Sequence, residues 1–166
     1  MKPFEKLTAK DIMNSDVVLV HDDMSVHELA ATLTDHGISG APVLNADGLL
    51  VGVVSLSDIV ANNGKRQAIR GGEHVGDFFL QGWEDELDET ELRPFHVIED
   101  DGLTVGDILT SVIYTADEGT DIATMADTMI QGRIHRLVVT RDDAVVGIVS
   151  TLDMLKALRS LSDEAA

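Results

Sequence analysis

The sequence predicts a mixed α/β (α+β) fold of two repeats, each in the order β-α-β-β-α, packed as a pseudo-twofold pair. The first observation behind this prediction is an internal repeat, because residues 51–60 and 146–155 match at five of ten positions without a gap. The second is the spacing of apolar residues, which is helical in one segment of each repeat and strand-like around it. We expect the first repeat over residues 8–62, a helical or loop insert over 63–103, and the second repeat over 104–160.

Each repeat begins with a short helical turn, at residues 8–13 and again at residues 104–109. These two segments are 96 residues apart, whereas Asp58 and Asp153 are 95 residues apart. One residue is therefore missing from the second repeat, and we place this deletion near residue 131. A change of offset belongs in a loop, because loops tolerate insertions and deletions.

A strand and a helix are expected next in each repeat. The strands are predicted at two β-branched runs, residues 17–20 and 112–114. In the first repeat, Ser25 and Glu28 then have the spacing of a capping box, which marks the start of a helix. Both helices carry apolar residues at positions i, i+3, i+4 and i+7, so each has one apolar face.

Gly37 and Gly132 are expected to end these helices, and a β-hairpin and a last helix complete each repeat. The hairpin turns contain Gly, Asn and Asp, which adopt unusual backbone angles readily. The last helix starts after Ser55 in the first repeat and after Ser150 in the second. The hairpin strands are predicted at residues 41–44 and 49–54, and at residues 137–140 and 144–149.

The insert between the repeats contains four of the six aromatic side chains of the chain, Phe78, Phe79, Trp83 and Phe95, among many acidic residues. Each repeat has only about 55 residues, which is small for an independent domain, so we expect the repeats to share a core. One interpretation of the insert is a pair of short helices whose aromatic side chains cover that core. The other is an anchor for dimerisation or for a protein partner.

The charge of the chain argues against two classes of partner. Thirty acidic and twelve basic side chains give a formal net charge of −18, which repels nucleic acid and anionic membranes. No apolar run approaches the roughly 20 residues that span a bilayer, and the N-terminus lacks the apolar segment of a secretory signal. We therefore expect neither nucleic acid nor a membrane as a partner.

Several kinds of chemistry also lack the residues that they need. The chain has no cysteine, which excludes disulfides, zinc–thiolate sites and thiol catalysis, and suits a reducing cytoplasm. The histidines show no metal-binding spacing, and there is no P-loop, no nucleophile elbow and no carboxylate pair that stands out. We expect no enzymatic activity, no metal site and no required cofactor.

Both repeats carry the pattern Gly-h-h-Ser-x-x-Asp, where h is apolar, at the junction of the last strand and the last helix. This doubled pattern resembles the CBS-domain family over nearly the whole chain outside the insert. Residues 52–59 and 132–139 are similar to segments of the gamma subunit of AMP-activated kinase. The resemblance implies a stand-alone tandem CBS module (a Bateman module) with two symmetry-related clefts. Family members hold AMP, ADP, ATP or S-adenosylmethionine there, and the modules often form homodimers.

The resemblance also implies roles for individual residues. The carboxylates of Asp58 and Asp153 would accept the two ribose hydroxyls, and the Ser55 and Ser150 hydroxyls would hold phosphate at a helix start. Ser57 would add a polar contact, which Leu152 cannot provide in the second repeat. An adenine slot would be lined by Val17, Val18, Val112 and Ile113, and the faces of the adenine ring would contact Ile38 and Ile134.

His135 and Arg136 match a pair that contacts phosphate in the gamma subunit, and Gly40 and Ala41 stand there in the first repeat. The two clefts are therefore unequal. Other interpretations stay open, since Ser-x-x-Asp is also a helix-capping pattern. His135 and Arg136 also fit a solvated strand edge.

The expected function is a non-enzymatic regulatory module that binds an adenine nucleotide or S-adenosylmethionine and changes conformation. It would act on an unidentified protein target, and a homodimer is the family expectation. The alternative is a structural dimerisation or interaction module whose clefts are empty.

Overall fold

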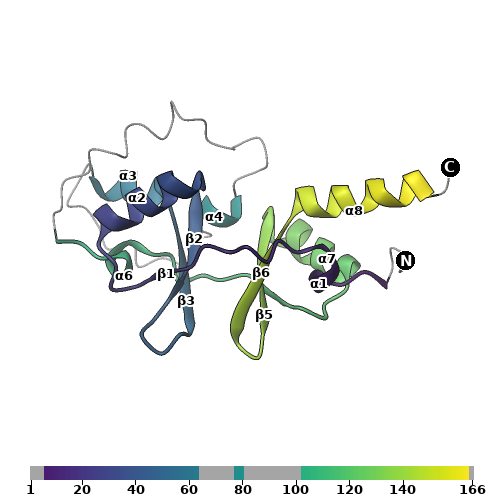
Figure 1. Ribbon diagram of the computed structural model, residues 1–166, viewed down its shortest axis with the longest axis horizontal. Helices are drawn as coiled ribbons and strands as arrows, with labels where there is room; N and C mark the ends of the chain where they lie inside the picture. Colours follow the sequence, from purple (N-terminus) through teal and green to yellow (C-terminus); the bar gives the residue numbers. More distant parts are fainter. Residues whose placement is uncertain (1–5, 64–76, 81–101, 165–166) are drawn as a thin grey trace. The chain divides into compact units, whose positions relative to one another are not determined.

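The strands in the described part of the chain form two three-stranded sheets (Figure 1). The computed structural model describes residues 6–63, 77–80 and 102–164. In each sheet the middle strand pairs in parallel with the strand before it and antiparallel with the strand after it. The α/β prediction is confirmed. The first sheet contains β1 (Val20–His21), β2 (Gly40–Leu44) and β3 (Leu50–Ser55), and the second contains β4 (Thr115–Asp117), β5 (Arg136–Arg141) and β6 (Ala144–Ser150).

The helices follow the predicted order, with a short turn ahead of each sheet and two longer helices around its hairpin. Within the described residues, no helix combines the length and the apolar character that a membrane crossing requires. The helices are α1 (Ala9–Ile12), α2 (Val26–His36), α3 (Leu56–Asn63), α4 (Asp77–Leu80), α6 (Val105–Ile108), α7 (Ile122–Gly132) and α8 (Thr151–Glu164).

The chain folds into two compact units, and these do not coincide with the repeats of the sequence. We call them the β1–β3 unit and the β4–β6 unit. Of the described residues, the β1–β3 unit contains 18–63, 77–78 and 102–113. The β4–β6 unit contains 6–17, 79–80 and 114–164. The helical turn that leads each repeat therefore belongs to the compact unit of the other repeat.

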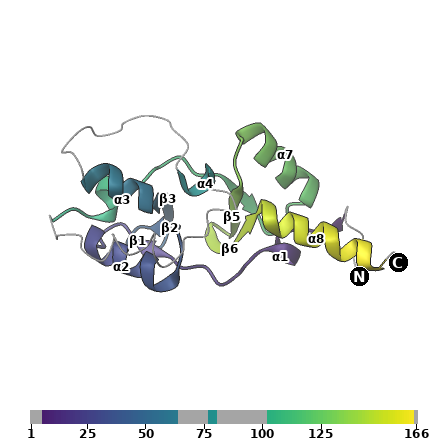
Figure 2. The ribbon, with the colours of Figure 1, turned by 90° about the horizontal axis from the view of Figure 1, so that it is seen from above.

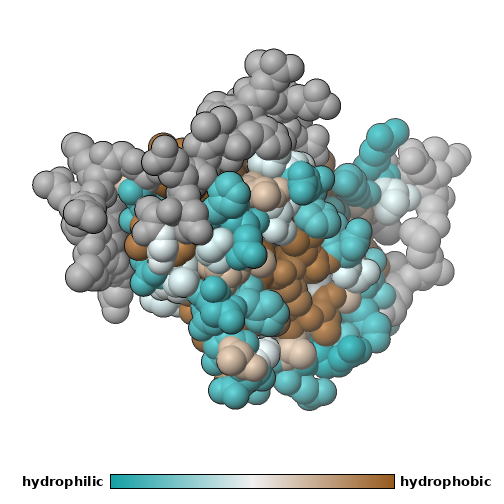
Figure 3. All heavy atoms as spheres, turned by 60° about the vertical axis from the view of Figure 1, so that its left-hand side comes forward, coloured by the Kyte–Doolittle hydropathy of each residue, from teal (hydrophilic) through white to brown (hydrophobic). Residues whose placement is uncertain are grey.

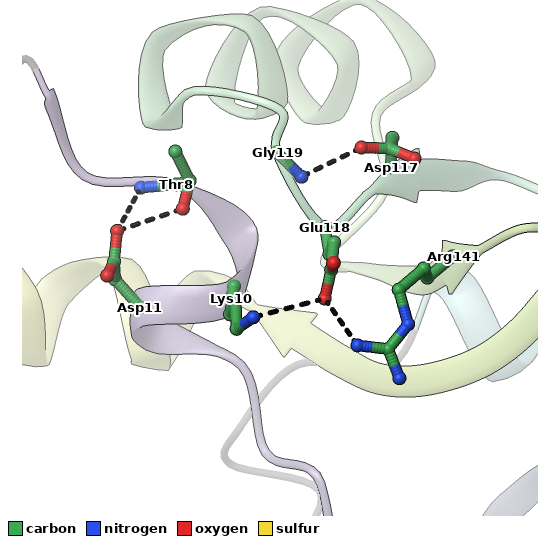
Figure 4. Close-up of polar contacts among 7 residues, drawn as sticks. All are labelled: Thr8, Lys10, Asp11, Asp117, Glu118, Gly119 and Arg141. Carbon is green, nitrogen blue, oxygen red and sulfur yellow. Dashed lines mark hydrogen bonds and ion pairs between the residues drawn. The ribbon is translucent and has the colours of Figure 1, made fainter.

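The N-terminal turn α1 is held in the β4–β6 unit, where it lies beside α8 and β6 (Figures 1 and 2). The Lys10 N–H donates to the Glu118 carbonyl at 2.9 Å, and Asn14 and Ile148 exchange two backbone bonds of 2.9 Å. Figure 4 shows the Glu118 carboxylate between two cations, Lys10 Nζ at 3.8 Å and Arg141 Nη1 at 3.4 Å. Main-chain bonds thus carry this attachment, because exposed ion pairs contribute little.

The equivalent turn α6 is held in the β1–β3 unit by the same pattern of bonds. The Gly106 N–H donates to the Asp22 carbonyl at 2.8 Å, as Lys10 does to Glu118 in the other unit. Val53 and Thr110 exchange two backbone bonds, of 2.9 and 2.8 Å. The exchange of leading segments is therefore reciprocal.

Both long helices end where the sequence predicts, but their left-handed cap residues differ. Ser25 caps α2 through a complete capping box, and Gly37 ends it with a φ of 62°. Helix α7 runs through Gly132, and Arg133 takes the left-handed conformation with a φ of 51°. The prediction that α7 ends at Gly132 is confirmed, although the left-handed residue that follows it is Arg133 and not a glycine. The two helices match at an offset of 96, so the counterpart of Gly37 is Arg133.

The one-residue deletion lies in the hairpin turn of the second repeat, and its prediction near residue 131 is wrong. Leu44 pairs with Leu50 in the first sheet, and Thr140 pairs with Val145 in the second. The offset is thus 96 before the turn and 95 after it. The shorter turn is Asp142–Asp143, whose φ angles of 49° and 64° fit a type I′ turn. The deletion does belong in a loop.

The first strand of each repeat is displaced from its prediction. Residues 17–20 contribute only Val20 to β1, and β4 begins after residues 112–114. In the second sheet the Val138 N–H donates to the Tyr114 carbonyl at 3.0 Å, which starts the ladder. The counterpart of Val138 is Pro42, which has no N–H to donate. The ladder of β1 is therefore two pairs long, and that of β4 is three.

The described aromatic residues of the insert are core residues. Phe78 is 1% exposed in the β1–β3 unit, and Phe79 is 0% exposed in the β4–β6 unit. Phe79 meets Tyr114 edge to face, with ring centroids 5.3 Å apart. For these two residues the structure favours the interpretation that the insert covers the core. Trp83 and Phe95 lie outside the described residues.

Candidate functional site

The Ser-x-x-Asp pair of the first repeat lies where β3 passes into α3. Ser55 is the last residue of β3 and is 0% exposed, and Asp58 is half-buried in the first turn of α3. The Asp58 Oδ2 accepts hydrogen bonds from the Ser55 N–H and from the Ser55 Oγ, both at 2.8 Å. The strand thus positions the serine, and the serine in turn orients the carboxylate at the helix start.

The pair of the second repeat has the same arrangement where β6 passes into α8. The Asp153 Oδ2 accepts from the Ser150 N–H at 2.9 Å and from its Oγ at 2.6 Å. The Asp153 N–H donates back to the Ser150 Oγ at 3.3 Å, which completes a reciprocal cap. The Asp153 Oδ1 lies 3.7 Å from the Lys156 Nζ.

The capping interpretation is confirmed for Ser150, whose Oγ accepts the Asp153 N–H. The bonds from serine to carboxylate that both pairs share also occur where no ligand role was expected. Asp11 accepts two bonds of 2.9 Å from Thr8, and Asp107 accepts bonds of 2.9 and 3.0 Å from Thr104. The two motif aspartates differ from these in being half-buried rather than exposed. Capping and ligand binding are compatible, since an ionised carboxylate has about four acceptor positions. Ligand binding stays a prediction.

At the start of α7 the roles are reversed, because an aspartate is the cap residue. Asp121 caps α7, and its side chain accepts from the Thr124 N–H at 2.9 Å. Hydrogen bonds from the Thr124 backbone and then from its hydroxyl lower the pKa of the Asp121 carboxyl below its ordinary value. This carboxylate lies on the surface and is not among the site residues.

The glycine of each motif makes room for the exchanged leading segment. A Cβ on Gly52 would lie 2.7 Å from the Thr110 carbonyl oxygen and 2.7 Å from a methyl carbon of Leu109. A Cβ on Gly147 would meet the side chain of Met13. The conserved spacing Gly-h-h-Ser-x-x-Asp within this chain therefore combines a packing requirement with a polar pair.

Arg136 brings a cation to the polar end of the β4–β6 sheet. It is the half-buried first residue of β5 and pairs with Ser150 across the hairpin. Directly opposite residues of antiparallel strands carry their side chains on the same face. His135 is exposed, and its N–H donates to the Phe79 carbonyl at 2.7 Å. Arg136, Ser150 and Asp153 thus gather at one end of this sheet.

The first repeat lacks this cation, although its counterpart residues differ from the predicted ones. Gly40 pairs with Ser55 as Arg136 pairs with Ser150. The residues that match His135 and Arg136 are therefore Ser39 and Gly40, and the assignment to Gly40 and Ala41 is wrong by one position. The cause is again the offset, which is 96 throughout this segment.

The apolar candidates occupy two kinds of position. Ile134 is 2% exposed, and Ile38 packs against the core of the β1–β3 unit. The remaining four are half-buried and lie outside the strands, namely Val17, Val18, Val112 and Ile113. A role in an adenine slot stays a prediction for all six.

The candidate residues are divided between the two compact units. The β1–β3 unit holds the fuller serine set, with Ser57 half-buried in α3, and the β4–β6 unit holds the cation. That the two sets meet on one ligand stays a prediction. The β1–β3 unit contains Val18, Ile38, Ser55, Ser57, Asp58, Val112 and Ile113, and the β4–β6 unit contains Val17, Ile134, His135, Arg136, Ser150 and Asp153.

A pocket that no sequence pattern predicts lies between α1 and α8 in the β4–β6 unit. This pocket has a volume of about 420 Å³ and includes Asp153 in its wall. Asp11 and Lys156 were not predicted as neighbours, because α1 is far from α8 along the chain. The spacing of Asp153 and Lys156 on one helix was the only available signal. The lining residues are Leu7, Asp11, Ile12, Asp153, Lys156, Ala157 and Ser160.

Comparison with known proteins agrees with the repeats and the fold. The sequence profile of the CBS domain matches residues 9–63 and 105–160. The uncharacterised protein MJ1426 of Methanocaldococcus jannaschii is 32% identical over 162 residues, which cover 93% of this chain and 92% of that protein. Another relative in that organism, MJ1225, is longer, and the 21% identical match covers 91% of this chain and 42% of MJ1225.

Two solved structures show the same fold at lower identity. The CBS domain pair of protein MJ0100, in complex with 5′-methylthioadenosine and S-adenosyl-L-methionine, has a TM-score of 0.63 and 22% identity. The match covers 93% of this chain and 98% of the MJ0100 chain. CBSX2 in complex with AMP has a TM-score of 0.63 and 23% identity, over 93% of this chain and 98% of its own. With two profile matches that fill both repeats, the chain belongs to the CBS domain family and is a tandem CBS pair.

Proposed function

We propose that this chain is a non-enzymatic regulatory module that binds AMP, ADP, ATP or S-adenosylmethionine and signals by a change of conformation. The observation that carries the proposal is the duplicated Ser–Asp pair, which has one geometry at Ser55–Asp58 and at Ser150–Asp153. The ligands of MJ0100 and CBSX2 support the choice of ligand class. We place the module in the cytoplasm, with an unidentified protein as its target.

The chemistry of the pairs suits a nucleoside. Each motif carboxylate is fixed by its serine through Oδ2, so its position is set before a ligand arrives. A ribose offers two neighbouring hydroxyls as donors. A carboxylate that is already held in position accepts from them without a further loss of side-chain entropy on binding. Arg136 provides a guanidinium for an anionic group, and it is valuable in a chain with a net charge of −18. The ligand changes the affinity of the protein target for this module only if the ligand binds one conformation of the module more tightly than the other.

A thermal-shift panel tests the proposal. The protein is heated with AMP, ADP, ATP or S-adenosylmethionine at millimolar concentration, and at least one is expected to raise the melting temperature. A ligand at about 100 times its Kd stabilises by about 2.7 kcal/mol, because it binds only the folded state. For a chain of this size each kcal/mol raises the melting temperature by about 2–4 °C. No shift with any ligand contradicts the proposal.

A pair of substitutions separates ligand binding from capping. Asp58→Asn and Asp107→Asn both alter a carboxylate that accepts two bonds from the preceding cap residue. Only Asp58→Asn is expected to weaken ligand binding, by about tenfold for a lost charged hydrogen bond. Equal effects of the two substitutions on ligand affinity would show that Asp58 acts only as a cap.

The alternative function, a dimerisation or interaction module, has its own supporting observation. Leu155 and Leu158 of α8 are 54% and 53% exposed. Figure 3 shows one face of the molecule, on which apolar side chains gather among hydrophilic ones. Exposed apolar side chains that cluster mark interfaces. Light scattering of Leu155→Glu plus Leu158→Glu tests whether α8 forms a homodimer. A monomer that still binds its ligand would separate the two functions.

A further inference from the structure

The pocket between α1 and α8 combines an apolar wall with charges of both signs. Leu7, Ile12 and Ala157 supply the apolar part. The polar part contains two carboxylates and one ammonium, from Asp11, Asp153 and Lys156. A volume of about 420 Å³ falls within the range of small-molecule sites, roughly 300–1,000 Å³. All these residues belong to the β4–β6 unit, so the pocket is complete within one compact unit.

The charges of this pocket do not suit a phosphate. One ammonium beside two carboxylates leaves the lining with a net negative charge, in a chain whose net charge is −18. Such a lining disfavours a ligand with two or more negative charges and no positive one. It favours a ligand that carries both an ammonium and a carboxylate, because each then faces an opposite charge.

We propose that this pocket binds the amino-acid end of a zwitterionic nucleoside, and that S-adenosylmethionine is preferred over AMP at Asp153. This inference rests on the proposed function and names the ligand class of one of its two Ser–Asp pairs. The α-carboxylate of the ligand pairs with Lys156, and its ammonium pairs with the Asp11 carboxylate. Asp153 keeps its role toward the hydroxyls, and Leu7 and Ile12 cover the aliphatic part.

The exposure of Lys156 fits this arrangement. Its side chain is 67% exposed, and its Nζ lies 3.7 Å from the Asp153 Oδ1, which is a loose pair. An exposed pair of this kind holds its partners weakly, so Lys156 turns toward a ligand carboxylate at little cost. The Asp11 carboxylate is less free to move, because its Oδ2 accepts two bonds of 2.9 Å from Thr8.

Calorimetric titration of the full chain with three probes tests the inference. The probes are S-adenosylmethionine, 5′-methylthioadenosine, which is the same nucleoside without the amino acid, and AMP. The variants are Lys156→Gln and Asp11→Asn, and the matched control is Lys10→Ala. Lys10 is also an exposed lysine of this unit, but it pairs with Glu118 and does not line the pocket. Because Lys156 is well exposed, Lys156→Gln keeps the fold, and a melting curve verifies this.

We expect Lys156→Gln and Asp11→Asn each to weaken S-adenosylmethionine about tenfold, and to leave 5′-methylthioadenosine within twofold of the unsubstituted protein. Lys10→Ala is expected to change neither. Equal loss for both nucleosides, or no loss for S-adenosylmethionine, overturns the inference. Binding of AMP without binding of S-adenosylmethionine overturns it and leaves the proposed function intact. If none of the three probes binds, the inference fails, and the thermal-shift result with ADP and ATP decides the proposed function.

Discussion

At the scale of single residues, Gly52 and Gly147 occupy the same place in the two motifs and face different neighbours. A Cβ at Gly52 would lie 2.7 Å from a backbone oxygen, that of Thr110, which is itself fixed by two bonds to Val53. A Cβ at Gly147 would meet the flexible side chain of Met13. A side chain can rotate away, whereas a paired backbone cannot do so without breaking its bonds.

We therefore expect Gly52→Ala to destabilise the protein by about 1–3 kcal/mol, and Gly147→Ala by less. Denaturant unfolding of the two variants measures the difference. The double variant Gly147→Ala plus Met13→Ala serves as the control, because it removes the side chain that the new methyl group meets. If Gly147→Ala costs as much as Gly52→Ala, the close approach of the backbone is not the reason for the glycine.

The left-handed residue at the end of α7 carries a second prediction. A residue other than glycine in this conformation costs roughly 1–2 kcal/mol, and Arg133 has a φ of 51° with an exposed side chain. Arg133→Gly is expected to stabilise the protein by about 1 kcal/mol, which raises the melting temperature by about 2–4 °C.

Two further substitutions isolate the backbone as the cause. Arg133→Ala removes the same side chain but keeps a Cβ, so it is expected to give no stabilisation. Gly37→Ala makes the reverse change at the end of α2, where φ is 62°, and is expected to destabilise. A stabilising effect of Arg133→Ala would assign the gain to charge rather than to backbone conformation.

At the scale of elements, one proline accounts for the difference between the two parallel ladders. Val138 donates its N–H to the Tyr114 carbonyl at 3.0 Å, and Pro42 holds the equivalent place in β2. Pro42→Val supplies the missing donor toward Val18. The net gain of one hydrogen bond, about 0.5–1.5 kcal/mol, is offset by the loss of proline's effect on the unfolded chain, about 0.4–1 kcal/mol.

We expect Pro42→Val to change stability by less than about 1 kcal/mol and to create a slowly exchanging amide at position 42. Val138→Pro is the converse, and it is expected to destabilise strongly because it removes a bond and a fully buried side chain. Hydrogen exchange followed by NMR reads both effects. Rapid exchange at position 42 would mean that β1 is short for a reason other than Pro42.

Much of this element structure follows from local sequence, and two of the errors share one cause. Ser25, Glu28 and Gly37 define the ends of α2 by themselves, since caps are local interactions. The place of the deletion and the counterpart of Arg136 depend on where the offset changes from 96 to 95. Similarity between the repeats is too low around residues 131–141 to show this. Only the pairing of β5 with β6 places the change in the turn.

At the scale of the whole molecule, the exchange of leading segments decides which residues form each unit. The motif pairs Ser55–Asp58 and Ser150–Asp153 were predictable because each lies within seven residues of chain around one strand–helix junction. The pocket beside Asp153 was not, because Asp11 reaches it from the start of the other repeat. Contacts between distant segments leave no periodic signal in the sequence.

The exchange predicts that the two repeats do not fold separately. We expect a fragment of residues 1–63 and one of residues 77–166 each to lack a cooperative thermal transition. In the first, the segment around Asn14 loses its two bonds to Ile148, and Val53 loses its two bonds to Thr110. Each fragment is also small, so the loss of one packed segment removes a large share of its core.

Mixing the two fragments at equal concentration is expected to restore one cooperative transition whose midpoint rises with concentration, because the folded state is then a complex. Circular dichroism of the separate and mixed fragments provides the measurement. The matched comparison is a pair of fragments cut between residues 113 and 114. This cut leaves α6 in the same fragment as the β1–β3 sheet on which it packs, and it separates α1 from the β4–β6 sheet. For that pair we expect residues 1–113 to hold the β1–β3 unit and to melt cooperatively without residues 114–166. Cooperative folding of residues 1–63 alone would show that α6 adds little to the first sheet. The reciprocal exchange would then be a consequence of folding rather than a requirement for it.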